Sequence, residues 1–96
     1  MSAAYLVALV KITSPDGWPE YRERVPQLVA EFGGRYLIRG GMVEVLEGSY
    51  DGRRLMVLEF PSMEAIRSFW NSPQYAAMKK LREGSGDLDV WAVPGA

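Results

Sequence analysis

The chain contains neither cysteine nor histidine. Without cysteine it forms no disulfide and offers no thiolate to a substrate or a metal ion. Without histidine, catalytic sites of the Ser-His-Asp and Cys-His types are excluded, and so is the commonest side-chain ligand of transition metals. The ligands that remain are scattered oxygen atoms, so we expect no bound metal ion, no haem and no other cofactor.

The sequence also lacks an excess of charge and a long apolar segment. It has 11 Lys and Arg against 12 Asp and Glu, a formal net charge of −1 at pH 7. This balance gives no long-range attraction to nucleic acid or to an anionic membrane. The apolar run near the N-terminus ends at Lys11, well short of the about 20 residues that a membrane-spanning helix needs. We therefore expect a soluble, cytoplasmic protein without nucleic-acid or membrane partners.

The length of 96 residues and the 48% share of hydrophobic residues suit one compact domain, because a chain of this size has too little interior for two cores. We expect a single domain over residues 1–96. Within it, the spacing of apolar residues predicts four strands and two helices. The strands are expected at 4–12, 35–47, 53–60 and 88–93, and the helices at 18–32 and 63–81, the second with a break at 71–73.

The first helix is predicted to be amphipathic. Its apolar face is assigned to Trp18, Tyr21, Val25, Leu28, Val29 and Phe32, and its polar face to Glu20, Arg22, Glu23, Arg24 and Glu31. Pro26 removes a hydrogen bond inside this helix and predicts a kink, and Gly33 with Gly34 predicts its end. Ser62 and Ser72 are candidate N-caps of the later helical segments.

The order strand, helix, strand, strand, helix, strand is that of the ferredoxin-like α+β fold, βαββαβ, with an antiparallel four-stranded sheet and two helices on one face. The predicted hairpin of 35–47 and 53–60 carries apolar side chains on both of its faces. Because two helices cover only one face of the sheet, the other face would stay exposed in a monomer. We therefore expect a homodimer in which two sheets bury these faces against each other.

Arg39 is the first candidate for a ligand-binding residue, because Gly40 and Gly41 follow it and leave space without side chains. If the hairpin turns about Tyr50, Gly41 lies opposite Glu59, and Arg39 lies on the diagonal at about 7–8 Å. Two interpretations are open. Arg39 and Glu59 form a structural salt bridge, or Arg39 binds an anion while Glu59 acts as a base or acceptor and the glycine gap holds the ligand.

Tyr36, Trp70, Asn71 and Tyr75 are further candidates for lining this pocket, because each carries a polar group. At its helical spacing, Trp70 is more typical of a packed core than of a binding site, and Asn71 is equally typical of a helix C-cap. Arg82 lies on the same helical face as Tyr75. There it either closes the pocket or is solvated near the C-terminus of the helix.

Three segments resemble a known family: the glycine- and arginine-rich segment at 33–41, Leu58-Glu-Phe-Pro-Ser62 and Trp70-Asn-Ser-Pro-Gln-Tyr75. In order and spacing they are similar to the domain-of-unknown-function 1330 family of the dimeric α/β-barrel superfamily. The resemblance covers nearly the whole chain and implies a homodimer with a barrel-like core, but no settled activity. Relatives in the wider superfamily include cofactor-independent monooxygenases, haem-degrading enzymes, and proteins similar to chlorite dismutase and muconolactone isomerase. This chain lacks the histidine that haem-binding members use as an axial ligand.

Three classes of function remain open. The first is binding of a small, partly apolar molecule, anionic or carbonyl-bearing, in a pocket of each subunit. The second is a cofactor-independent monooxygenase or isomerase in which Glu59 or Tyr75 handles protons and Arg39 holds an enolate. The third is a structural or interaction module whose dimer face is its purpose, which a filled interior with an Arg39–Glu59 pair would favour.

Overall fold

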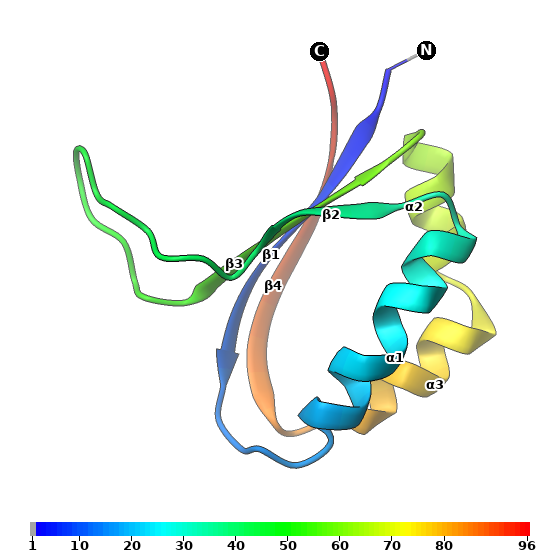
Figure 1. Ribbon diagram of the computed structural model, residues 1–96, viewed down its shortest axis with the longest axis horizontal. Coiled ribbons are helices and arrows are strands. Elements are labelled where there is room, and N and C mark those ends of the chain that lie inside the picture. Colours follow the sequence, from blue (N-terminus) through cyan, green and yellow to red (C-terminus); the bar gives the residue numbers. More distant parts are fainter. Residues whose placement is uncertain (1) are drawn as a thin grey trace.

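The computed structural model describes residues 2–96 (Figure 1). Its strands are β1 (Ala4–Ile12), β2 (Arg35–Arg39), β3 (Arg54–Phe60) and β4 (Gly86–Pro94), and its helices are α1 (Trp18–Glu31), α2 (Met63–Trp70) and α3 (Pro73–Leu81). All neighbouring strands are antiparallel, in the order β2-β3-β1-β4. The helices pack on one face of this sheet, which confirms the predicted ferredoxin-like fold.

β1 lies between β3 and β4, in the central position that its apolar sequence predicts. Its inward residues Ala4, Leu6, Ala8 and Val10 are buried beneath the helices. The residues between them, such as Val7 and Leu9, point to the opposite face and are partly exposed. The sequence of β1 is apolar almost throughout, which is typical of a strand buried on both faces. In a single chain, however, its outer face is uncovered, because within residues 2–96 the helices pack on the other face of the sheet.

Glycines define both ends of α1. Gly17 at the N-cap has a φ of 79°, and Gly33, after the last turn, has a φ of 82°. Both values lie in the left-handed region that glycine adopts without a steric penalty. A Cβ atom on Gly17 would lie 1.5 Å from the carbonyl oxygen of Leu81, so this glycine lets the start of α1 pack directly on the end of α3.

The starts of α2 and α3 follow the predicted capping pattern. The Ser62 hydroxyl accepts a hydrogen bond from the Ala65 N–H at 3.0 Å, and the Ser72 hydroxyl accepts one from the Tyr75 N–H at 3.1 Å. Pro73 then occupies the first turn of α3, where its missing N–H costs nothing. This restart buries Tyr75, which is 4% exposed.

The predicted strand 35–47 is too long. β2 ends at Arg39, and residues 40–53, which we call the arm, project away from the sheet (Figure 1). Gly40 has a φ of 73°, which turns the chain out of the strand conformation. The exposed apolar side chains of the arm include Met42 and Leu46. Within residues 2–96, no helix is both long enough and apolar enough to cross a membrane.

Candidate functional site

A cavity of about 110 Å³ lies between the inner face of the sheet and the three helices. Leu6, Ala8 and Val10 of β1 form part of its floor, and aromatic side chains of the helices close it from above. An apolar cavity of roughly 150 Å³ is known to hold benzene. The enclosed space therefore suits a ligand whose apolar body is about one six-membered ring.

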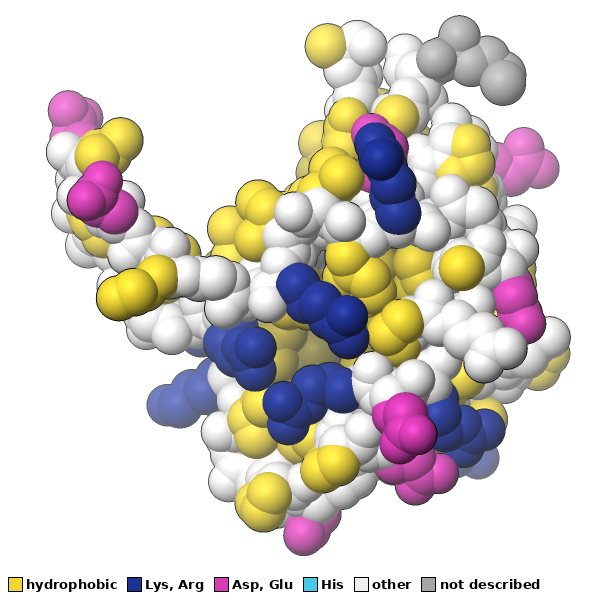
Figure 2. All heavy atoms as spheres, viewed as in Figure 1, with side chains coloured by type: hydrophobic (Ala, Val, Ile, Leu, Met, Phe, Trp, Pro, Cys, Tyr) yellow, Lys and Arg dark blue, Asp and Glu magenta, His cyan; other side chains and the backbone are white. Residues whose placement is uncertain are grey.

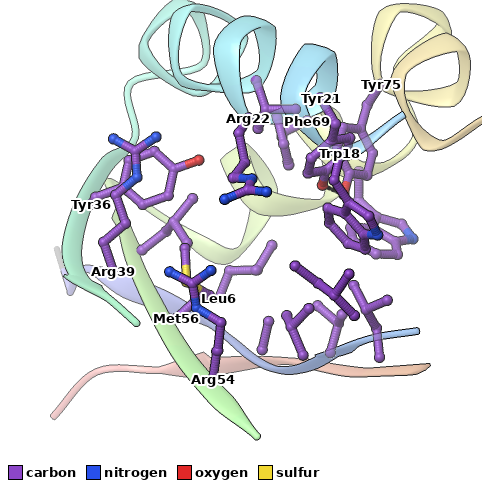
Figure 3. Close-up of a pocket in the computed structure, with 18 residues that line it drawn as sticks. Leu6, Trp18, Tyr21, Arg22, Tyr36, Arg39, Arg54, Met56, Phe69 and Tyr75 are labelled. Atoms are coloured by element: carbon purple, nitrogen blue, oxygen red, sulfur yellow. Dashed lines mark hydrogen bonds between the residues drawn. The ribbon is translucent and has the colours of Figure 1, made fainter. Parts of the chain in front are cut away.

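Three arginine side chains surround the mouth of this cavity, and we call them the arginine rim: Arg22 of α1, Arg39 of β2 and Arg54 of β3. Figure 2 shows Lys and Arg side chains gathered around a hollow with hydrophobic atoms at its base, and Figure 3 shows the three guanidinium groups beside the cavity. Within residues 2–96, none of the three forms an ion pair, and no Asp or Glu lines the cavity. The rim is therefore positively charged without compensation from the chain.

The strand geometry places two of the rim residues. Arg54 precedes Met56 and Leu58 on the inward face of β3, because side chains alternate along a strand. A Cβ atom on Gly40 would lie 2.8 Å from the Arg54 guanidinium, so the missing side chain makes room for Arg54. Arg39 stacks on the ring of Tyr36, with its guanidinium carbon 4.6 Å from the ring centroid.

Tyr21 and Tyr75 form a hydrogen-bonded pair of hydroxyl groups, 2.7 Å apart, at the end of the cavity beside Trp18 (Figure 3). Arg82, next to the end of α3, donates from Nη2 to the Tyr75 hydroxyl at 3.2 Å. Burial, followed by the neighbouring Tyr75, raises the pKa of Tyr21 far above its ordinary value, so this hydroxyl stays protonated at physiological pH. Arg82 is half-buried and contacts Tyr75, so it is not the fully solvated side chain of the second interpretation, but it stands behind the tyrosine pair and does not itself line the cavity.

The structure brings some of the predicted site residues together and separates others. Tyr36, Arg39, Trp70 and Tyr75 line the cavity. Burial raises the pKa of the Tyr36 hydroxyl, and nearby Arg39 opposes this rise. Outside the cavity lining lie Gly40, Gly41, Glu59 and Asn71.

The reasons differ for these four residues. Gly40 contributes only the space for Arg54, and Gly41 lies in the arm with no atom within 4 Å of its would-be Cβ. Asn71 is the exposed C-cap of α2, which was its alternative interpretation. Glu59 points to the outer face of the sheet, since its neighbours Leu58 and Phe60 are buried on the inner face.

The predicted pairing of Arg39 with Glu59 is wrong. A bulge between Tyr36 and Ile38 shifts the register, so that Arg39 lies opposite Met56 and Arg35 lies opposite Glu59. Glu59 accepts hydrogen bonds from Arg35 Nε at 2.9 Å and from the Tyr5 hydroxyl at 3.3 Å. Arg39 and Glu59 therefore form no structural salt bridge, and they do not face one ligand as anion-binding residue and base.

Two residues of the arginine rim, Arg22 and Arg54, were not predicted as site residues from the sequence. Arg22 was assigned to the polar face of α1, although it follows Trp18 by four residues and precedes Val25 by three, a spacing that shares their face. Arg54 alternates with Met56 and Leu58, which is the signal of an inward position at the open end of a strand. The spacing of both residues therefore indicates an inward position. Hydropathy alone assigns arginine to the solvent, because arginine is usually exposed, and so it gives the wrong face for both.

Arg39→Ala is expected to change the free energy of unfolding by less than about 1 kcal/mol, because Arg39 is exposed, lacks an ion pair and loses only its stacking on Tyr36. Urea unfolding at a fixed protein concentration measures this change. A loss of about 3–5 kcal/mol, the cost of leaving a buried partner charge unpaired, would contradict the geometry described above.

Within residues 2–96, no group of three or more Asp or Glu side chains is arranged to hold a metal ion, and the chain has no His or Cys to add. The arrangement offers instead an apolar interior, positive charge at the mouth, and phenolic hydroxyls inside. Such a site can bind and orient an anion with an apolar body.

Several solved structures of low sequence identity share the fold of this chain. A protein of unknown function from Rhodopseudomonas palustris superposes with a TM-score of 0.78 at 17% identity, covering 99% of this chain and 83% of that one. A hypothetical protein from Arabidopsis thaliana gives 0.69 at 17% identity, covering 100% and 90%. SnoaB, a cofactor-independent oxygenase from Streptomyces nogalater, gives 0.57 at 11% identity, covering 100% and 95%. At these identities the likeness shows the fold alone.

No curated protein matches the chain. A family model, however, matches residues 3–96, nearly the whole sequence. This match agrees with the resemblance seen in the three sequence segments and with the ferredoxin-like fold. The chain therefore belongs to the family described as "Domain of unknown function (DUF1330)".

Proposed function

We propose that each subunit binds a small carboxylate with an apolar body, and that the protein acts as a homodimer. The arginine rim carries the ligand proposal. Three exposed guanidinium groups at one cavity mouth repel one another, and no carboxylate among residues 2–96 pairs with them. A bound carboxylate supplies that charge and accepts paired hydrogen bonds from arginine.

The apolar floor selects the remainder of the ligand. Leu6, Met56 and Val90 face the cavity from three different strands and offer no charged group to it. A small inorganic anion would leave this surface unused, whereas a ring or short hydrocarbon chain gains about 25 cal/mol for each Å² of apolar surface removed from water. The ligand class is therefore an amphipathic carboxylate, not a free inorganic anion.

Calorimetric titration with para-isopropylbenzoate, and with the uncharged para-isopropylbenzamide, tests this proposal. The acid should bind at least about tenfold more tightly than the amide, a difference of about 1.4 kcal/mol. Arg39→Gln and Arg54→Gln should each remove most of this preference. Arg67→Gln, at an exposed position of α2 outside the cavity, is the matched control and should leave it unchanged. Equal affinity for acid and amide would contradict the proposal.

A cofactor-independent monooxygenase or isomerase is the second candidate, and one observation favours it. Tyr75, one of its two proposed proton-handling residues, lines the cavity. Glu59, the other, lies on the outer face and bonds to Arg35, so the candidate loses its carboxylate base. The likeness to the oxygenase SnoaB concerns the fold. Binding is therefore the better supported function.

Two features support the homodimer. The outer face of the sheet exposes apolar side chains that no helix covers, among them Ile38, Trp91 and Val93. The chain also exposes 6328 Å², whereas a monomeric globular protein of 10.7 kDa exposes about 5500 Å². The excess, about 800 Å², equals what one partner buries in a protein–protein interface of standard size.

A further inference from the structure

We infer that the hydroxyl pair of Tyr21 and Tyr75, with Arg82 behind it, donates a hydrogen bond to a carbonyl oxygen of the ligand. This inference rests on the proposed function and narrows it. The ligand would then be a cyclic or aromatic carboxylate that carries a carbonyl group at the end remote from the carboxylate.

A count of hydrogen atoms supports this inference. The two hydroxyl groups carry two protons, and the hydrogen bond between them uses one. Arg82 only donates, and its hydrogen bond ends on the Tyr75 oxygen, so it consumes neither proton. Whichever tyrosine donates to the other, one phenolic proton has no acceptor among the hydrogen bonds of residues 2–96. A partly buried donor of this kind needs an acceptor.

The neighbouring polar groups do not supply that acceptor. The Trp18 indole N–H, which lies beside the pair, is itself a donor and is already bound to the Ser85 carbonyl at 2.7 Å. Arg82 Nε is buried and has no hydrogen-bond partner. The neighbours of the tyrosine pair are thus hydrogen-bond donors. An oxygen atom of a bound ligand would supply the acceptor that the free phenolic proton lacks.

Arg82 also strengthens the donor. Its guanidinium lies 5.3 Å from the centroid of the Tyr21 ring and bonds to the Tyr75 hydroxyl. A hydrogen bond donated to a hydroxyl oxygen polarises that hydroxyl and makes it a better donor in turn. Arg82, Tyr75 and Tyr21 therefore form one series of polarised hydrogen bonds. The phenolic proton that the tyrosine pair does not use internally is available to a neutral oxygen of the ligand.

The position of the pair defines where the carbonyl lies in the ligand. In Figure 3, Tyr21 and Tyr75 lie at one side of the cavity, whereas Arg39 and Arg54 lie at the other. The cavity of about 110 Å³ between them matches a single ring. A carboxylate at the rim and a carbonyl at the tyrosine pair thus occupy opposite ends of one ring.

A matched pair of probes tests the inference. The ligands para-acetylbenzoate and para-isopropylbenzoate share the ring and carboxylate. They differ at the substituent, where a carbonyl oxygen replaces one methyl group and the hydrogen atom of the branching carbon. The measured quantity is the ratio of their affinities in the wild type and in the Tyr21→Phe/Tyr75→Phe double variant. The preference for the acetyl compound should fall at least about fivefold in the double variant, as expected for one lost hydrogen bond. Tyr21→Phe alone keeps the Tyr75 donor and its bond to Arg82, so it should retain the preference.

The outcomes separate this inference from the proposed function. If both benzoates bind and the ratio is the same in wild type and double variant, the inference is wrong and the carboxylate site remains. If neither benzoate binds, both proposals are wrong. If the double variant fails to fold, a measurement on the wild type replaces it: the carbon-13 chemical shift of the acetyl carbonyl in bound para-acetylbenzoate. A resonance downfield of its position in an aprotic solvent supports the hydrogen bond, and a resonance at that position overturns it.

Discussion

Replacing Gly17 with alanine should lower the free energy of unfolding by about 3 kcal/mol or more, because two penalties coincide there. The added Cβ would lie 1.5 Å from the Leu81 carbonyl oxygen, which belongs to backbone and cannot rotate away. The φ of 79° would also force an L-residue into the left-handed region. Urea unfolding at a fixed protein concentration measures the loss, and the melting temperature should fall by at least about 10 °C.

Gly84→Ala is the matched control for this experiment. Gly84 has a φ of 75°, but no atom lies within 4 Å of the position of its would-be Cβ. Its substitution carries only the conformational penalty of about 1–2 kcal/mol. Equal losses for Gly17→Ala and Gly84→Ala would mean that the start of α1 does not pack directly against the end of α3.

The same packing determines the inner end of the cavity. Gly17 brings α1 against α3, so Tyr21, one turn into α1, meets Tyr75 in the first turn of α3. Arg82, just beyond Leu81, then reaches Tyr75. A Gly17→Ala protein that remains folded should therefore lose its preference for the acetyl probe before it loses carboxylate binding at the rim.

The sequence predicted most of the fold because its signals are local. A continuous apolar run located β1, and apolar alternation located β4. The serines at 62 and 72 located the starts of α2 and α3, and Gly33 located the end of α1. Each of these signals depends on neighbours within a few residues. They therefore hold without knowledge of how the elements pack.

The register of β2 against β3 was not predictable in the same way. The apolar residues of 40–47 continue the strand pattern past Arg39, yet the chain leaves the sheet at Gly40. The bulge between Tyr36 and Ile38 has no signature in residue type, and a register shift moves every later pair. Glu59 was consequently assigned to the cavity although it points away from it.

The sequence named some of the residues that line the cavity and missed the role of others, because some contacts depend on how distant elements pack. Of the predicted residues, Tyr36, Arg39, Trp70 and Tyr75 line one cavity, to which β2, α2 and α3 contribute. Tyr21 was placed on the apolar face of α1 without a role, and its hydroxyl partner became visible only with the packing of α1 on α3. Pairs that join distant elements require the tertiary structure.

Val7→Lys should convert the proposed homodimer into monomers and raise the dissociation constant at least about 100-fold, which corresponds to about 2.7 kcal/mol. Val7 lies at the middle of the outer face, opposite Val57 on β3 and opposite Trp91 on β4. In a monomer the ammonium group can reach water from this partly exposed position. Between two apolar sheet faces it would be buried without a partner, which is costly.

Sedimentation velocity at micromolar concentration checks this result. The wild type should sediment with twice the chain mass, and Val7→Lys with the mass of one chain and an unchanged far-ultraviolet circular dichroism spectrum. Ala77→Lys, at an exposed position of α3 on the helix side of the sheet, adds the same charge elsewhere and should remain dimeric. A monomeric wild type, or a Val7→Lys protein that stays dimeric, would show that the outer face of the sheet is not the interface.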